Sequence, residues 1–159
     1  MRSLDPMNTN CSVSFQIDEL VGYEPVVHSV TPVINGTPLT ELVTSFETVQ
    51  QFEPLGGYGG LIPEFFKYGP LDSYLMGGFD PGGYWDQLGG IYVLGCDCGE
   101  VGCWPLICRL KRDGNVVVWD RFRNPFRPER DYSRFGPFVF DATLYRNAAR
   151  DLQVRFTMR

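Results

Sequence analysis

The sequence predicts an α+β fold in which a mainly antiparallel sheet is covered by two helices and by an aromatic, glycine-rich segment. Strand-type runs separated by a turn signal fill residues 91–123, which we interpret as an antiparallel meander. Apolar residues recur at helical spacing in residues 38–50 and 142–150. Eighteen Gly and 12 Pro among 159 residues imply many turns and few long helices. This length predicts one domain, 1–159, with residues 1–11 as a flexible N-terminal tail.

The first two expected elements are strands. Residues 12–21 alternate weakly between apolar and polar side chains, and residues 26–35 are rich in β-branched side chains. The second run ends in Asn35-Gly36, a dipeptide typical of tight turns. Pro32 cannot donate a ladder hydrogen bond, so we expect this run at the edge of a sheet.

A helix is expected next, over residues 38–50. Thr37 can serve as its N-cap and Pro38 as its first helical residue. Glu41 and Glu47 are expected on its outside. The apolar side chains follow the spacing of a single helical face: Leu39, Leu42, Val43, Phe46 and Val49.

Residues 54–90 combine five Gly-Gly pairs with many large apolar side chains. This composition differs from that of a flexible Gly/Ser linker, because the aromatic side chains need a surface on which to pack. Short helical turns are expected at residues 63–68 and 71–76. A long loop of this kind fits two roles, a functional surface or a packed cover over the sheet.

Three consecutive strands are expected at residues 91–97, 103–111 and 115–123. Asp113-Gly114 is a natural turn between the last two strands. Together these strands form the predicted antiparallel meander.

Three further elements are expected after the meander. Residues 137–140 can form a fourth strand. Asp141 then caps a helix over residues 142–150. Residues 152–158 alternate between apolar and polar side chains, which predicts a last strand.

Four of the five cysteines form the pattern C-x-C-x4-C-x4-C. If the flanking strands pair as a hairpin, Cys98 and Cys103 face each other with Cβ atoms about 4.5–5.5 Å apart. Cys96 then shares the face of Cys98, about 6.6 Å further along the strand. Cys108 falls on the opposite face of the sheet.

Cys96, Cys98 and Cys103 are therefore candidate zinc ligands. Tetrahedral zinc needs sulfur atoms about 3.8 Å apart, which the facing pair can reach and Cys96 can approach if the strand bends. His28 or Cys11 is the candidate fourth ligand. We expect a protein without a cofactor, with zinc as the alternative.

Three other roles stay open for the cysteines. A redox role needs a thiol of low pKa, whereas Asp97 and Glu100 beside the C-x-C motif raise a thiol pKa. A nucleophilic Cys–His enzyme would need His28, the single histidine, as its base. In the simplest interpretation, the cysteines pack as small apolar residues in a tight, glycine-rich hairpin.

The net charge of −5 hides an uneven distribution. Residues 1–108 contain two Lys or Arg against 13 Asp or Glu, and residues 109–159 contain 12 against six. A strip at 119–135 interleaves arginines with aromatic residues, as nucleic-acid-binding surfaces do. The overall acidic charge favours the alternative, in which the two halves of one domain neutralise each other. The candidate interaction residues of the strip are Trp119, Arg121, Arg123, Phe126, Arg127 and Arg130.

Several classes of protein are not indicated by the sequence. No run of 18 apolar residues predicts a transmembrane helix, and the first residues lack the apolar core of a secretory signal. We therefore expect a cytoplasmic protein without a membrane partner. A dinucleotide-binding fingerprint, a phosphate loop, Gly-x-Ser-x-Gly and His-x-x-x-His are all absent from the sequence, which favours a protein without enzymatic activity.

The stretch from Leu94 to Tyr145 resembles a family of uncharacterised bacterial proteins. Segments upstream, Ile34-Asn35-Gly36 with Leu39 and Leu42, look similar too, so the resemblance touches about two thirds of the chain. It implies a bacterial or phage cytosolic source and carries over no catalytic residues. The matching segments are LGCDCG, GCWPL, VW, GPF and FD, together with Phe122, Pro125 and Arg127.

Three hypotheses of function follow. The first is a non-catalytic bacterial or phage protein that binds or inhibits another protein, in the manner of an immunity protein that neutralises a basic toxin or nuclease. The second is a structural zinc-binding domain that uses Cys96, Cys98 and Cys103. The third is an enzyme or a nucleic-acid-binding protein that uses the strip at 119–135, with nucleic acid the less favoured partner.

Overall fold

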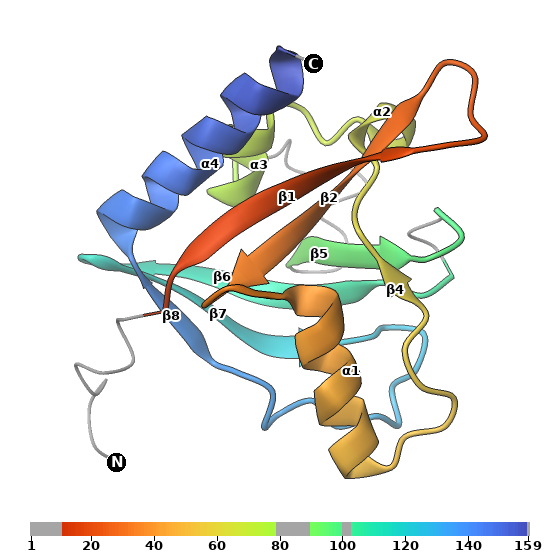
Figure 1. Ribbon diagram of the computed structural model, residues 1–159. Helices are drawn as coiled ribbons and strands as arrows, with labels where there is room; N and C mark the ends of the chain where they lie inside the picture. Colours follow the sequence, from red (N-terminus) through yellow and green to blue (C-terminus); the bar gives the residue numbers. More distant parts are fainter. Residues whose placement is uncertain (1–10, 79–89, 100–102, 159) are drawn as a thin grey trace.

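The computed structural model describes residues 11–78, 90–99 and 103–158 and shows an α+β fold, as the sequence predicts (Figure 1). Its strands form two antiparallel sheets, one of three strands and one of five. Four helices accompany them within these residues. The expected flexible tail falls almost entirely on residues 1–10, outside the described part of the chain.

The first sheet confirms the two predicted N-terminal strands. Its strands pair antiparallel and lie in chain order: β1 (Val13–Leu20), β2 (Val27–Ile34) and β3 (Thr37–Pro38). The register of β1 and β2 runs from Val13 opposite Ile34 to Leu20 opposite Val27. The two long strands therefore form a hairpin that projects to one side of the molecule (Figure 1).

Pro32 lies in the central strand β2, not at the sheet edge where we expected it. On the side of β2 away from β1, Val30 N–H donates to Leu61 O at 2.7 Å. Residues two apart along a strand have the same orientation, so the nitrogen of Pro32 faces this side as well. β3 pairs there only with Val33 and Ile34. The missing N–H of Pro32 therefore costs no ladder hydrogen bond.

Helix α1 (Leu39–Gln50) begins one residue later than predicted, because Pro38 is its N-cap residue and no side chain caps it. The expectation that Glu47 is exposed is wrong, since its relative exposure is 0%. The carboxylate is buried because Arg130 and the hydroxyl of Tyr132 reach it there. The buried side chains of α1 lie four residues apart on one face: Leu39, Val43 and Glu47.

The second sheet confirms the predicted meander and extends it at both edges. The connection between β5 and β6 is longer than predicted, because β5 ends at Cys96 and β6 begins only at Leu106. The first five residues of β5 are all buried, so both faces of this strand are covered. The strands lie in chain order: β4 (Tyr58–Gly59), β5 (Ile91–Cys96), β6 (Leu106–Asp113), β7 (Val116–Arg123) and β8 (Phe138–Asp141).

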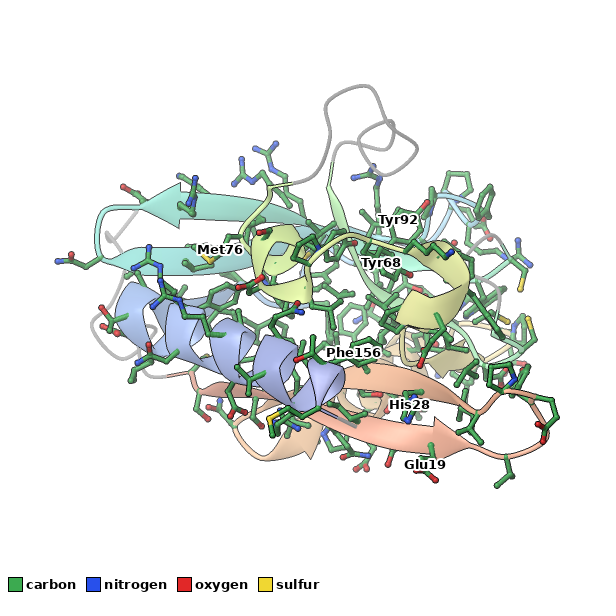
Figure 2. All side chains as sticks on the ribbon, turned by 90° about the horizontal axis from the view of Figure 1, so that it is seen from above. Glu19, His28, Tyr68, Met76, Tyr92 and Phe156 are labelled. Carbon is green, nitrogen blue, oxygen red and sulfur yellow. The ribbon has the colours of Figure 1, made fainter. Side chains whose placement is uncertain are left out.

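Helix α4 (Ala142–Thr157) begins where the sequence predicts. The carboxylate of Asp141 caps it by accepting the N–H of Leu144 at 3.0 Å. Seen from above, the helix lies between the β1–β2 hairpin and the β6–β7 hairpin (Figure 2). Near its C-terminal end, the guanidinium of Arg155 donates to Phe15 O in β1 at 2.7 Å. The last helix thereby closes onto the first strand.

The prediction of a last strand at residues 152–158 is wrong, because α4 continues through Thr157. Leu152 is buried on the same helical face as Tyr145, seven residues earlier. Val154 and Met158, which completed the strand-like alternation, are 54% and 79% exposed. The apolar pattern therefore fits a helix with one buried face.

The described part of the glycine-rich segment forms a packed cover over the sheets. Helices α2 (Pro63–Phe66) and α3 (Leu71–Leu75) confirm the predicted helical turns. At Gly60, a Cβ atom would meet Thr31 Oγ1 at 2.6 Å, so the segment approaches β2 more closely than a larger residue permits. Residues 79–89 of this segment lie outside the described part of the chain. Its buried side chains are Tyr58, Leu61, Ile62, Tyr68, Leu71, Tyr74 and Leu75.

None of the helices formed by residues 11–78, 90–99 and 103–158 has the length and apolar character required to cross a membrane.

Candidate metal centre

The cysteine cluster lies in the connection from β5 to β6. Cys96 is the last residue of β5, and the chain turns directly after it. Asp97 N–H donates to Gly57 O at 2.8 Å, and Gly99 N–H donates to Cys96 O at 2.9 Å. Gly99 has a φ of 97°, a left-handed conformation that favours glycine. These backbone hydrogen bonds fix the turn that carries Cys98.

The structure brings the sulfur atoms of Cys96, Cys98 and Cys103 within 4.8 Å of one another. The Sγ atoms of Cys98 and Cys103 are 3.2 Å apart. Tetrahedral zinc with Zn–S bonds of about 2.3 Å needs sulfur atoms about 3.8 Å apart, so small side-chain movements suffice. The three cysteines therefore have the spacing of a metal site.

Cys96 joins this group because the chain bends, which is the condition that the sequence analysis set for it. Strand alternation placed Cys98 about 6.6 Å beyond Cys96 along a continuing strand. Because the strand ends at Cys96, the turn at Asp97 brings Cys98 back, and Cys98 N–H lies 3.5 Å from Cys96 Sγ as a donor. The turn, rather than cross-strand pairing, assembles the cluster.

The contacts among the three thiols disfavour the ionisation of Cys96 and Cys103. Burial, together with hydrogen bonds to Cys103 and Cys98, raises the pKa of Cys96 to about 12. The contact with Cys96 lowers the pKa of Cys103, but the contact with Cys98 and burial outweigh it and leave that pKa raised. Without a cation, Cys96 and Cys103 therefore favour the neutral thiol form. A redox role, which needs a readily formed thiolate, is disfavoured by these shifts.

The two candidate fourth ligands lie elsewhere. His28 Nδ1 is 2.7 Å from Glu64 Oε2, and the imidazole ring packs edge-on against Phe156 (Figure 2). Cys11 forms an isolated bridge with Phe140. Neither residue belongs to the cysteine group that the structure identifies within its described residues.

Cys108 is fully buried in β6 and does not belong to the group of three cysteines. Burial raises the pKa of its thiol well above the ordinary value. Cys98 and Cys103 are exposed, and Cys96 is half-buried. A cation bound by these three sulfur atoms would keep one position open toward solvent, as zinc sites with three protein ligands do.

The arginine and aromatic residues predicted to form an interaction strip are dispersed by the fold. Trp119 is fully buried in the core, where its Nε1–H donates to the hydroxyl of Tyr145 at 3.1 Å. The side chain of Arg130 is only 4% exposed. Phe126 is 47% exposed, and Arg121 is exposed with a positive φ of 53°. These residues therefore do not form one continuous exposed surface.

Arg130 of the predicted strip belongs instead to a buried polar network, which the sequence analysis did not predict. The carboxylate of Glu47 accepts from Tyr132 Oη at 2.6 Å, from Arg130 Nη1 at 3.2 Å and from Gly56 N–H at 2.9 Å. Tyr58 and Tyr132 share a hydrogen bond of 2.9 Å between their hydroxyls. Glu47 lies four residues after Val43, on the apolar face of the helix, and this spacing could have predicted from the sequence that Glu47 is buried.

This network extends to the connection that carries the cysteines. Trp104, the residue after Cys103, lies under the guanidinium groups of Arg127 and Arg130, at 4.4 Å and 5.1 Å from its ring. Such cation–π contacts contribute about 0.5–2 kcal/mol each. Through Arg130 and Glu47, the connection to β6 is anchored to helix α1.

Comparison of the chain with protein-family models, with curated proteins and with solved structures finds no match. The resemblance to a family of uncharacterised bacterial proteins therefore stays a prediction.

Proposed function

We propose that this protein is a zinc-binding domain in which Cys96, Cys98 and Cys103 hold a Zn²⁺ ion between β5 and β6. The observation that carries the proposal is the convergence of their three sulfur atoms within 4.8 Å of one another. Thiolates are preferred ligands of zinc, and a divalent cation reverses the penalty against ionised thiols. The bound ion would link the end of β5 to the start of β6.

The surrounding backbone supports a ligand role for Cys96. The N–H of Cys98 points at its sulfur from 3.5 Å, and an N–H donor stabilises negative charge on a ligand sulfur. The hydrogen bond from Asp97 N–H to Gly57 O holds the turn against the preceding segment. A ligand set that is oriented in advance loses little conformational entropy when the ion binds.

The test is the metal content of the wild-type protein purified without added metal. We expect about one zinc per chain, since structural zinc is held tightly. Cys98→Ser and Cys103→Ser should lose the ion, whereas Cys11→Ser, a cysteine outside the cluster, should retain it. Cobalt(II) substitution should give thiolate-to-cobalt charge-transfer absorption in the wild type and in Cys11→Ser only. Less than about 0.1 zinc per chain, with no cobalt band, would contradict the proposal.

A second proposal retains the hypothesis of a non-catalytic protein that binds another protein. It is supported by apolar side chains at the β1–β2 turn and on α2 that are exposed or half-buried, which we call the hairpin patch: Val21, Tyr23, Val26 and Phe65. Val21 is 92% exposed, Val26 46% and Phe65 44%. The rings of Tyr23 and Phe65 are 5.4 Å apart, and both border Gly99 of the cysteine turn. Exposed apolar patches mark protein contact sites, and a partner there could supply the fourth zinc ligand.

Capture experiments with the immobilised protein test this second proposal. We expect a partner to be retained from a lysate of the source organism at moderate salt, and to be lost with Val21→Asp. Leu144→Asp, which also replaces an exposed apolar residue, is the matched control and should retain the partner. Equal capture by all three proteins, or capture by none, would contradict a role for the hairpin patch.

A further inference from the structure

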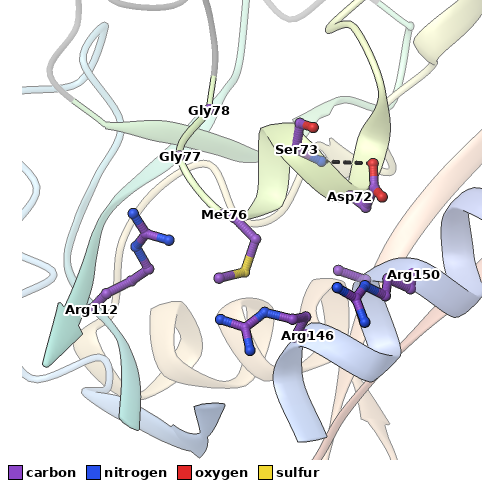
Figure 3. Close-up of a pocket in the computed structure, with 9 residues that line it drawn as sticks. Asp72, Ser73, Met76, Gly77, Gly78, Arg112, Arg146 and Arg150 are labelled. Atoms are coloured by element: carbon purple, nitrogen blue, oxygen red, sulfur yellow. Dashed lines mark hydrogen bonds between the residues drawn. The ribbon is translucent and has the colours of Figure 1, made fainter. Parts of the chain in front are cut away.

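A cavity of about 300 Å³ lies between α3, α4 and β6 and shares no lining residue with the cysteine cluster. Three arginines line it: Arg112 on β6, and Arg146 and Arg150 on α4. Met76 and Ala149 add apolar surface. Figure 3 shows the side chain of Met76 between those of Arg112 and Arg146. Arginine side chains from two structural elements therefore line one concave site.

The cavity carries an excess of positive charge. Among the described residues that line it, Asp72 is the one carboxylate, and one oxygen of that carboxylate already accepts Ser73 N–H at 2.8 Å. None of the three arginines forms an ion pair with a residue in the described part of the chain. Arg146 and Arg150 are one helical turn apart, a spacing at which like charges repel. A bound anion would relieve this repulsion.

The walls of the cavity are held in place by hydrogen bonds at both ends of α3. At its start, Leu71 N–H donates to the side-chain oxygen of Gln153 on α4. At its end, the hydroxyl of Tyr145 on α4 donates to Leu75 O at 2.6 Å. Because the walls are ordered before a ligand binds, binding costs little additional conformational entropy.

We propose that this cavity binds the phosphate group of a small molecule. The planar guanidinium fork matches phosphate oxygens with paired, charge-assisted hydrogen bonds. The volume lies at the lower end of the range of about 300–1,000 Å³ for small-molecule sites, which fits a compact ligand. A long nucleic acid is disfavoured, because the chain carries a net charge of −5 and the arginines line a cavity rather than an extended surface.

Calorimetric titration with sodium pyrophosphate and with inorganic phosphate tests the proposal. At 0.15 M NaCl we expect saturable binding of pyrophosphate with a Kd below about 1 mM, and weaker binding of phosphate. Arg112→Gln and Arg146→Gln should each weaken binding about tenfold or more, because each removes a charge-assisted contact. Lys111→Gln is the matched control, since Lys111 is an exposed neighbour of Arg112 that does not line the cavity. It should change the affinity less than about twofold.

Two results would overturn the proposal. One is the absence of saturable pyrophosphate binding up to about 10 mM, or an equal loss in Lys111→Gln, which would indicate general charge attraction. The other is tighter binding of a single-stranded oligonucleotide with the same arginine dependence, which would assign the site to nucleic acid. Cys98→Ser should bind pyrophosphate like the wild type, so failure of the zinc proposal leaves this test intact.

Discussion

Replacement of Glu47 by Leu should destabilise the protein more than any other change of a single charge on helix α1. The side chain is fully buried, and its carboxylate accepts hydrogen bonds from Arg130, Tyr132 and the backbone of Gly56. Leucine has a similar volume but no acceptor, so the guanidinium of Arg130 stays buried without its counter-charge. Breaking a buried ion pair in this way costs about 3–5 kcal/mol.

The measurement is the free energy of unfolding from urea denaturation, with Glu41→Leu as the matched control. Glu41 is exposed on the same helix, so its replacement should change the free energy of unfolding by less than about 0.5 kcal/mol. For a chain of 159 residues, a loss of about 3–5 kcal/mol lowers Tm by roughly 6–20 °C. The double variant Glu47→Leu/Arg130→Met should recover much of the loss, because no unpaired charge then remains buried.

An equal effect of Glu47→Leu and Glu41→Leu would refute this reasoning. The reasoning would also be refuted if the double variant lost as much free energy of unfolding as the Glu47→Leu and Arg130→Met variants lose in sum. The first result would mean that Glu47 is hydrated in solution, and the second that the two residues act independently.

Three further predictions concern the metal, pH and the last helix. If zinc is bound, a chelator should lower Tm of the wild type and leave Cys98→Ser unchanged; equal curves for the wild type with and without chelator would count against a structural ion. Burial raises the pKa of Tyr58 to about 12 and that of Tyr74 above its ordinary value, so the fold favours their protonated forms. The contribution of these protonated tyrosines to the free energy of unfolding should be fully present below about pH 10 and decrease as the pH rises toward 12. Tyr58 alone should contribute about 2–3 kcal/mol. Urea midpoints at pH 8, 10 and 11 that do not decrease would contradict this. Asp141→Ala removes the cap of α4 and should cost about 1 kcal/mol, whereas Asp113→Ala, at the exposed end of β6, should cost less than half of that by urea denaturation.

The sequence predicted most elements of the fold because their signals are local. The β1–β2 hairpin, helix α1, the meander and the start of α4 each depend on periodicity, turn residues or caps within about a dozen residues. The predicted last strand failed because apolar side chains at every second position also satisfy a helix when only Leu152 and Phe156 face inward. Packing of α4 against β1 and α3 decides between the two, and those partners lie far away in the sequence.

The candidate site was predicted in part for a similar reason. The sequence singled out Cys96, Cys98 and Cys103, but it could not establish the bend after Cys96 that brings the first of them to the other two. Glu47 and Arg130 were both assigned to the surface, because a charged residue alone gives no sign of a partner 83 positions away. Buried charge pairs are a property of the tertiary structure, and single-residue propensities do not contain them.

The hydrogen bond from Arg155 to Phe15 joins residues 140 positions apart, and this has a consequence for synthesis of the chain. The ribosome makes β1 before α4, so β1 lacks its helical neighbour until α4 has been synthesised. During that interval, the apolar faces that α4 covers stay exposed in the nascent chain. We therefore expect truncations within the last turn of α4, or bulky C-terminal fusions that obstruct it, to reduce the soluble yield more than equivalent changes at the β1–β2 turn.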